Sequence, residues 1–394
     1  MNRILALLLL FPIFSTAQST NTNLPFILQD EKKLSVYKQI FKAGNRKVIA
    51  EVDSLIADAN KALNSGPFSV TFQKNKIPPS GDLHDYVSQA PYWWPDSSKA
   101  DGRPYMRRDG RINPERNQSK DRGQMGDMSG NVRRLALSYY FTNNEAYAKK
   151  AIELMRVWFI DTATRMNPNL NFGQYIPGIN NGRGIGIIET GGLTNIPDAL
   201  AMIQQSKNLH IGFITGMKQW FNEYTQWLLN SPNGKEERSQ INNHGTYYDM
   251  QLADFALFLG DKPLAQKVIR EYTIPRIDQQ FTVDGAQPLE LIRTKSWNYS
   301  TMNLVGWCKL AAIADHVNID LWNQTTMDGK GIKRVFEWFS PYMLKEKPWR
   351  YEQIEAIGYN NILKIFSIAN IKYSNAFEKV LSRYPESINE KPWW

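Results

Sequence analysis

The sequence predicts an all-α fold built from stacked pairs of helices. Apolar residues recur at helical spacing through most of the 394 residues, whereas alternating β patterns are scarce, with Phe68–Phe72 as a brief exception. Many of the expected helices arrive in pairs joined by short turns, as at Leu259–Pro263. A helix that buries one face must pack against a neighbour, so we expect either a helical solenoid or a closed α/α barrel.

Periodicity, with Gly, Pro, Asn and Asp at the breaks, sets the bounds of the expected helices. In chain order these are Lys32–Lys42, Lys47–Asn64, Asn131–Phe141, Glu145–Ile160, Ile196–Gln205, Ile211–Leu229, Thr246–Leu259, Lys262–Phe281, Ser300–His316, Ile332–Leu344, Gln353–Ile368 and Asn375–Tyr384. Two long segments, Ser65–Gly130 and Arg165–Asn195, interrupt the helices. Loops this long are usually functional or disordered, and their many aromatic and cationic residues favour ordered binding loops.

Residues 1–17 have the pattern of a signal peptide. Arg3 supplies a positive start, Ile4–Phe14 is a short apolar run, and Ser15–Ala17 offers small residues for cleavage. The apolar run is too short to span a bilayer, and we expect no membrane span elsewhere. We therefore expect an exported protein, periplasmic or extracellular, in which residues 18–394 form a single domain. Cys308 is the only cysteine, which excludes an internal disulfide.

The composition limits the classes of binding partner but does not select one of them. The formal net charge is +9, from 47 Lys and Arg against 38 Asp and Glu. A basic exported protein suits a polyanion, which could be an acidic polysaccharide, a nucleic acid or a membrane surface. The 12 Trp and 18 Tyr serve as core residues, but such rings also stack on the faces of sugars.

The first long loop has the residues of a clamp for an acidic sugar chain. It contains HDYVSQAPYWWPD, from His84 to Asp96, in which Trp93 and Trp94 form a stiff aromatic platform between prolines. Nearby guanidinium groups can bind carboxylates as two-pronged forks. Alternatively, the tryptophans only pack the loop onto the core. Candidate substrate contacts in this loop are His84, Trp93, Trp94, Arg107 and Arg108, with Arg103 and Arg111 beside them.

The second long loop adds two weaker candidates, Arg183 and Glu189, around the sequence PGINNGRGIG. Its glycines would let the backbone approach a ligand. No strand precedes it, so a phosphate-binding or dinucleotide-binding loop is disfavoured. Glu189 is expected to orient an arginine rather than to act as a base.

Two further stretches carry the candidate catalytic groups. QINNHGTYYDMQ, from Gln240 to Gln251, places Asn243 and His244 near the start of an expected helix, where backbone N–H groups point outward. A lone histidine is more often structural, and no second histidine lies at metal-ligand spacing, which disfavours zinc.

The second stretch, Pro288–Leu304, contains Arg293, Lys295 and Tyr299. Glu290 precedes Arg293 and could orient it. A tyrosine six residues after an arginine is by itself uninformative, so these residues gain meaning only from the reaction that they would suit together.

That reaction is β-elimination from a 4-linked uronic acid, in which the hydrogen on C5 is removed beside the carboxylate. Asn243 and Arg293 could neutralise the carboxylate and stabilise enolate-like charge in the transition state. Tyr299 could take the proton and return one to the leaving O4, provided that nearby cations lower its pKa. In mannuronate the hydrogen on C5 and the leaving O4 lie on one face of the sugar. In guluronate they lie on opposite faces, so a second group such as His244 is needed.

The motifs YWWPD, DGRPYMRRDGRINPE, NNHGTYYDMQ and the Arg293–Tyr299 segment resemble the alginate lyase superfamily, from about His84 to past Leu304. The resemblance is greatest to polysaccharide lyase family 38 and more distant to family 5. It implies an incomplete α/α toroid with long lid-like loops, acting on alginate by elimination without metal or other cofactor. It implies Asn243 and Arg293 as carboxylate neutralisers, His244 as charge stabiliser or base, and Tyr299 as base and acid. Lys295 is added to the substrate contacts. Neither nucleic acid nor an obligate protein partner is expected.

Three alternatives stay open at this point. One is a glucuronan lyase of the same fold. Another is a glycoside hydrolase, which needs two opposed carboxylic acids, although no pair stands out among Asp249, Asp284, Glu189 and Glu290. The third is a glycan-binding protein without catalytic activity that uses Trp93, Trp94 and the arginines.

Overall fold

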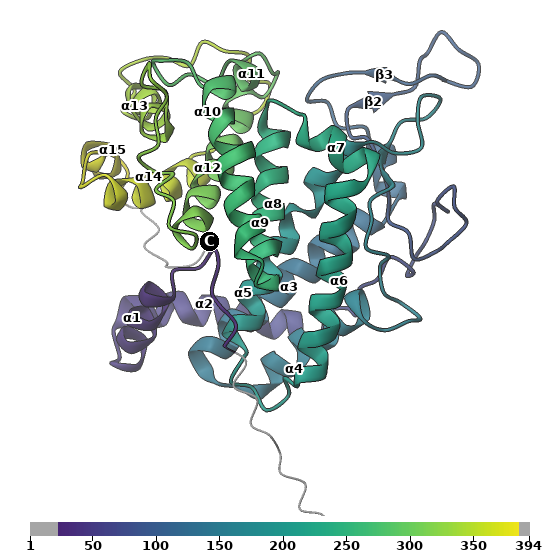
Figure 1. The fold of residues 1–394 in the computed structure, drawn as a ribbon, viewed down its shortest axis with the longest axis horizontal. Helices are drawn as coiled ribbons and strands as arrows, with labels where there is room; N and C mark the ends of the chain where they lie inside the picture. Colours follow the sequence, from purple (N-terminus) through teal and green to yellow (C-terminus); the bar gives the residue numbers. More distant parts are fainter. Residues whose placement is uncertain (1–22, 386–394) are drawn as a thin grey trace, which may run out of the picture.

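The computed structural model describes residues 23–385, so the expected signal peptide at 1–17 lies outside the described residues. The described chain is mostly helical, as expected (Figure 1). Its α-helices are α1 (Glu31–Lys42), α2 (Arg46–Leu63), α3 (Asp121–Thr142), α4 (Glu145–Phe159), α5 (Asn195–Met202), α6 (Ile211–Asn230), α7 (Pro232–Arg238), α8 (Asn243–Leu259), α9 (Lys262–Lys267), α10 (Ile274–Gln280), α11 (Pro288–Leu291), α12 (Ser296–Asp315), α13 (Ile332–Met343), α14 (Asn360–Lys372) and α15 (Glu378–Ser382).

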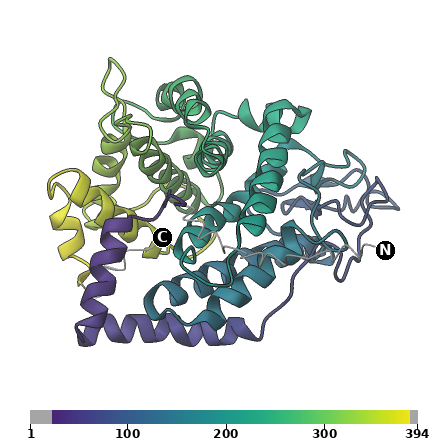
Figure 2. The same ribbon diagram turned by 60° about the horizontal axis from the view of Figure 1, so that its bottom comes forward.

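Helix α8 is the centre of the packing. It contacts α6, α7, α9 and α12, and nearly all of its side chains are buried (Figure 1). The two-residue turn between α3 and α4 makes an antiparallel pair, and α1 and α2 run along the outside of the molecule (Figure 2). Buried hydrophobic residues from Leu24 to Leu381 form one continuous cluster. Within residues 23–385, no helix is long and apolar enough to cross a membrane.

Several expected bounds need correction. Helix α3 begins at Asp121 rather than Asn131, because Gly123, Gly126 and Gly130 mask its apolar spacing although Met125 and Met128 are buried. The expected helix at Gln353–Ile368 begins only at Asn360.

The predicted helix at Lys262–Phe281 is a helical run through 262–280 whose middle, η3 (Val268–Thr273), has π-helical hydrogen bonding. Phe68–Phe72 is not a strand: it is a loop and turn, held in place by the buried Ser69 and Val70.

The strands lie instead in the two long loops. Strand β1 (Val87–Gln89) pairs in parallel with β4 (Phe172–Tyr175), which joins the first long loop to the second. Strand β2 (Trp93–Trp94) pairs antiparallel with β3 (Met106–Arg107) and forms a projecting hairpin (Figure 1). Two 3₁₀ helices, η1 (Pro114–Gln118) and η2 (Gly184–Thr194), lead back into the helical body. The loops are therefore ordered around short elements of their own.

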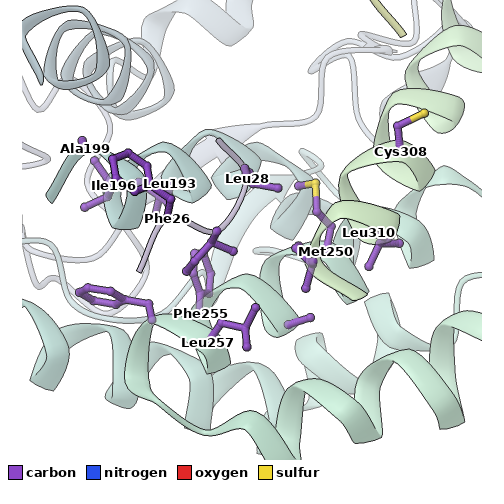
Figure 3. Packing of buried hydrophobic residues seen from close by; sticks show 14 of the residues in the cluster. Phe26, Leu28, Leu193, Ile196, Ala199, Met250, Phe255, Leu257, Cys308 and Leu310 are labelled. Carbon is purple, nitrogen blue, oxygen red and sulfur yellow. The ribbon is translucent and has the colours of Figure 1, made fainter. Parts of the chain in front are cut away.

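The segment before α1 is inserted into the helical core. The carboxylate of Asp198, on α5, accepts hydrogen bonds from the backbone N–H groups of Ile27, Leu28 and Gln29 at 2.6 to 3.0 Å. His316, at the end of α12, bonds the carbonyl oxygen of Ile27 at 2.8 Å. Figure 3 shows Phe26 and Leu28 among apolar side chains of α5, α8 and α12. The buried side chain of Asp198, together with His316, thus anchors the start of the described chain to the middle of the fold.

We predict that Asp198→Ala destabilises the protein strongly, because three buried N–H groups lose a charged acceptor. The loss should be on the order of 3–5 kcal/mol, measured by urea denaturation. Asp315→Ala is the matched control, since that carboxylate forms a solvent-exposed ion pair with Lys372 and its removal should cost about 0.5 kcal/mol or less. Equal effects of the two substitutions would mean that the segment is not anchored by Asp198.

Candidate active site

The candidate catalytic groups lie at one end of the helical body. The start of α8, the helices α7 and α11, and the β2–β3 hairpin all lie at the upper edge of Figure 1. Asn242 caps α8, because its side chain accepts a hydrogen bond from the backbone N–H of His244 at 3.1 Å. This cap fixes the backbone of Asn243 and His244, which form the first turn of the helix.

Asn243 is completely buried and is held by Glu290, on α11. Its backbone N–H donates to Glu290 Oε1 at 2.8 Å and its Nδ2 to Glu290 Oε2 at 2.7 Å. Its Oδ1 is buried without a partner among the described residues, so Glu290 alone sets the orientation of the amide. The sequence suggested that Glu290 could orient Arg293, but the hydrogen bonds of its side chain go to Asn243.

His244 is held in the same way by a second buried glutamate, Glu237 on α7. The imidazole Nδ1 lies 2.7 Å from Glu237 Oε1, and the Glu237 side chain is 0% exposed whereas that of His244 is 15% exposed. Burial raises the pKa of Glu237, and the adjacent His244 opposes that effect. Because Nδ1 is engaged, Nε2 is the ring nitrogen that remains for a substrate.

The loop that leads into α8 is braced from behind by Arg276. Its guanidinium forms a buried ion pair with Asp249, at 2.7 Å from Nε to Oδ2, and donates to the carbonyl oxygens of Arg238 and Gln240. Gly245 makes this reach possible, because a Cβ there would lie 2.3 Å from Arg276 Nη1 and 2.1 Å from the carbonyl oxygen of Gln240. The position of the first turn of α8 is therefore fixed by contacts on several sides.

Arg293 and Tyr299 form the other half of the site. The guanidinium carbon of Arg293 lies 3.9 Å from the centre of the Tyr299 ring, which is close contact for a cation over an aromatic face. Burial raises the pKa of the Tyr299 hydroxyl, the guanidinium of Arg293 opposes this, and a hydrogen bond with Tyr92 adds to the increase. A positive charge fixed against the ring favours the phenolate that proton abstraction requires.

The first long loop closes directly onto these two groups. Asp109 accepts from Arg293 Nε at 3.1 Å and from Nη2 at 2.7 Å, and it also accepts from the backbone N–H of Thr294. Tyr299 donates its hydroxyl to that of Tyr92 at 2.6 Å. Gly110 lets the loop dock, since a Cβ at its φ of +67° would lie 2.3 Å from Thr294 Oγ1.

The predicted substrate contacts lie in varied surroundings. Trp93 and Trp94 are partly exposed on the β2–β3 hairpin, and Arg108 lies 5.5 Å over the Trp94 ring. Arg107 is exposed and pairs with Asp109 at 2.8 Å. Their role as contacts for a sugar chain stays a prediction.

The remaining candidates already have protein partners. His84 bonds the carbonyl oxygen of Arg165 at 2.6 Å, and Arg183 donates to Gln174 at 2.9 Å. Lys295 is 7% exposed and pairs with Glu355.

Glu189 has a side chain that is 3% exposed, and it accepts from Tyr86 and Ser88 at 2.7 and 2.6 Å. Its carboxylate also lies 3.4 Å from Arg122 Nε and 4.0 Å from Arg116 Nη2. Among residues 23–385, no group of three or more His, Cys, Asp or Glu side chains could hold a metal ion.

Sequence reasoning missed three residues of the site: Tyr92, Asp109 and Glu237. Tyr92 and Asp109 lie within motifs that were noticed, but nothing in the spacing says that they reach residues about two hundred positions later. Glu237 lies seven residues before His244 on a separate short helix, so no helical spacing connects the two.

We predict that Asp109→Ala frees the first long loop from the helical body, because the pairs with Arg293 and Thr294 disappear. Hydrogen–deuterium exchange should become faster over residues 90–112 and stay unchanged in α8. Asp96→Ala is the control, since within residues 23–385 the Asp96 side chain accepts hydrogen bonds only from Ser98, in its own loop. Unchanged exchange in the Asp109 variant would show that other contacts hold the loop.

Comparison with known proteins places this chain in a family. A family model described as alginate lyase matches residues 69–349. The crystal structure of an alginate lyase from Bacteroides ovatus has 38% sequence identity and a TM-score of 0.87, over 91% of this chain and 95% of that one. No curated protein sequence gives a significant match.

More distant structures share the fold. Alginate lyase A1-III from Sphingomonas species A1 has 15% identity and a TM-score of 0.52, over 85% of this chain and 88% of that one. A histidine-to-alanine variant of A1-III, solved with a tetrasaccharide, has 15% identity and a TM-score of 0.55, over 89% and 90% of the two chains. Because the family match spans most of the chain and the B. ovatus structure is similar along nearly its whole length, the chain belongs to the alginate lyase family.

Proposed function

We propose that the protein is a lyase that cleaves alginate by β-elimination, with Asn243, His244, Arg293 and Tyr299 as its catalytic residues. The observation that supports this most directly is the guanidinium of Arg293 held 3.9 Å from the ring centre of Tyr299. A phenol in contact with a fixed cation, with a buried amide and an imidazole at the start of the adjacent helix α8, suits removal of a proton beside a carboxylate.

In mannuronate, one tyrosine performs both proton transfers. The Tyr299 phenolate takes the hydrogen of C5, the electrons of the C5–H bond form the C4–C5 double bond, and the C4–O4 bond breaks. O4 then receives the proton from the Tyr299 hydroxyl, which regenerates the phenolate. In this proposal Asn243 binds the substrate carboxylate through the second N–H of its Nδ2, because the first N–H is already bonded to Glu290.

Arg293 has two ways to act on the substrate. Its bonds to Asp109 use Nε and Nη2, and Nη1 has no hydrogen-bond partner in the described part of the chain. A uronate carboxylate can bind Nη1, or it can replace Asp109 when the loop lifts, because both present a carboxylate to the same fork. Lifting the loop also removes Tyr92 from Tyr299, which lowers the barrier to forming the phenolate.

Two other expectations belong to the same proposal. We propose that residues 1–17 direct export and that residues 18–394 act as one domain. The mass of the mature protein tests the cleavage site.

We expect the purified protein to generate the ultraviolet absorbance of an unsaturated uronate from alginate in the presence of a chelator. Tyr299→Phe should lower kcat by at least about 10²-fold with little change in binding, because only the hydroxyl is lost. Tyr384→Phe is the control, since that hydroxyl bonds the carbonyl oxygen of Met343. Chain cleavage without absorbance would point to a hydrolase, and absorbance from glucuronan alone would reassign the substrate.

Arg293→Ala should shift the pH dependence of kcat on poly-mannuronate. Burial raises the pKa of Tyr299 and Arg293 opposes it, so loss of the cation raises this pKa further. Since the phenolate is the base, the rise of kcat with pH should move to more alkaline values. Arg293→Lys, which retains the charge, should shift it less. An unchanged profile in the Ala variant would show that Arg293 does not act on Tyr299.

A further inference from the structure

A cluster of aromatic rings lies at the surface of α13 and of the segment that follows it. The rings of Trp338, Tyr342, Trp349 and Tyr351 contact one another, with their centres 4.8 to 6.0 Å apart. The first three residues are partly buried, and Tyr351 is 37% exposed. Rings that brace one another lose little freedom when a ligand packs against them. We refer to these four residues as the aromatic patch.

Packing of the core accounts for part of this patch only. Trp349 lies against the buried rings of Phe339 and Trp297, with centres 6.2 and 5.0 Å away. Within residues 23–385, the ring of Tyr351 contacts only Trp338 and Trp349, and it leaves a face to solvent. Exposed aromatic rings gathered in one place are typical of a surface that binds a ligand.

The segment that carries Tyr351 is basic. It has three basic and two acidic residues between α13 and position 352: Lys345, Lys347, Arg350, Glu346 and Glu352. Glu346 is already paired with Lys379 at 2.9 Å, whereas Arg350 is exposed and forms no ion pair within residues 23–385. Burial, Tyr351 and Asp284 raise the pKa of Tyr342, and Arg350 opposes them, so its guanidinium lies near the rings. A free cation therefore lies beside the aromatic patch.

The aromatic patch is joined to the start of α12, the helix that carries the proposed base. Trp349 Nε1 donates to Ser296 Oγ at 2.9 Å, and Ser296 donates to the carbonyl oxygen of Glu352 through Oγ at 2.6 Å and through its backbone N–H at 3.1 Å. Lys295 and Gln353 form an antiparallel bridge one residue further along. The segment thus leads from the patch to the edge of the candidate active site.

We propose that Trp338, Arg350 and Tyr351 form a distal subsite, which binds further sugar residues of the acidic chain that is cleaved. The proposal rests on the lyase function above and extends the site along its substrate. In Figure 1, α13 and the β2–β3 hairpin lie at the same upper edge, on opposite sides of α11. A chain bound across the catalytic residues from the hairpin can therefore continue onto the patch.

A uronate residue offers both kinds of group that this subsite recognises. The C–H groups on one face of a sugar ring pack against an aromatic ring, and the carboxylate pairs with a guanidinium. A neutral sugar would lack the second contact. We therefore expect the distal subsite to prefer an acidic polysaccharide, and to contribute to binding rather than to the chemical step.

The first test compares a long and a short substrate. Tyr351→Ala should raise KM for polymeric alginate by about threefold to tenfold and leave kcat nearly unchanged, because stacking binds ground and transition states alike. The increase should shrink as the chain shortens and be smallest for a mannuronate trisaccharide. Ile371→Ala is the control, since Ile371 is 62% exposed on α14. An equal increase for polymer and trisaccharide, or a fall in kcat alone, would contradict a distal subsite.

A second pair of variants tests the charge without altering the rings. Arg350→Glu should raise KM for polymeric alginate by about tenfold at low salt, and added salt should reduce this effect. Arg383→Glu is the matched control, because it makes the same change of net charge at another exposed position and should alter KM by less than about twofold. Equal effects of the two substitutions would mean that only the overall charge matters, and would overturn the proposal.

Binding without turnover separates this proposal from the lyase function. Polymeric alginate in a native gel should retard the Tyr299→Phe variant, and adding Tyr351→Ala and Arg350→Glu should weaken the retardation. Unchanged retardation would reject the distal subsite, whether or not the protein cleaves alginate. Absence of unsaturated product with the unmodified protein would instead reject the lyase function, so the two failures are distinguishable.

Discussion

Two buried carboxylates hold the first turn of α8, and the geometry of the whole site depends on them. Glu290 fixes the amide of Asn243, and Glu237 fixes the ring of His244. A carboxylate out of contact with water is costly unless donors compensate it, so each glutamate enforces the position of the group that it binds. Side chains held in this way need little reorganisation when a substrate arrives, which is what preorganised catalysis requires.

The opposite side of the site is covered by the first long loop. At the site, the loop meets the helical body through Asp109 and Tyr92, which bind the proposed catalytic groups Arg293 and Tyr299. The Asp109 carboxylate that binds Arg293 and the Tyr92 hydroxyl that binds Tyr299 resemble groups of an acidic sugar. The site thus lies between a helical half, braced by the buried ion pair of Arg276 with Asp249, and a loop half that contacts it through side chains a substrate could replace.

Much of the fold could be predicted because helical periodicity is a local property. The long helices and the two interrupting loops followed from such patterns, whereas the alginate lyase family was indicated by the resemblance of particular motifs such as YWWPD and NNHGTYYDMQ. The errors have local causes too: the glycines of α3 concealed its first turns, and no apolar spacing marks the break before Asn360. For the site, residue type and the chemistry of elimination pointed to Asn243, His244, Arg293 and Tyr299, whose roles stay predictions.

By itself, the sequence determined the helical class, the family and the residues with suitable chemistry, because each depends on neighbours in the chain or on side-chain type. Only the tertiary structure decided what holds those residues. Asp109 meets Arg293 across 184 positions and Tyr92 meets Tyr299 across 207, and no sequence spacing encodes contacts of that range. The same holds for Glu237: its helix reaches His244 only because α7 and α8 pack together, so folding alone gives the imidazole its partner.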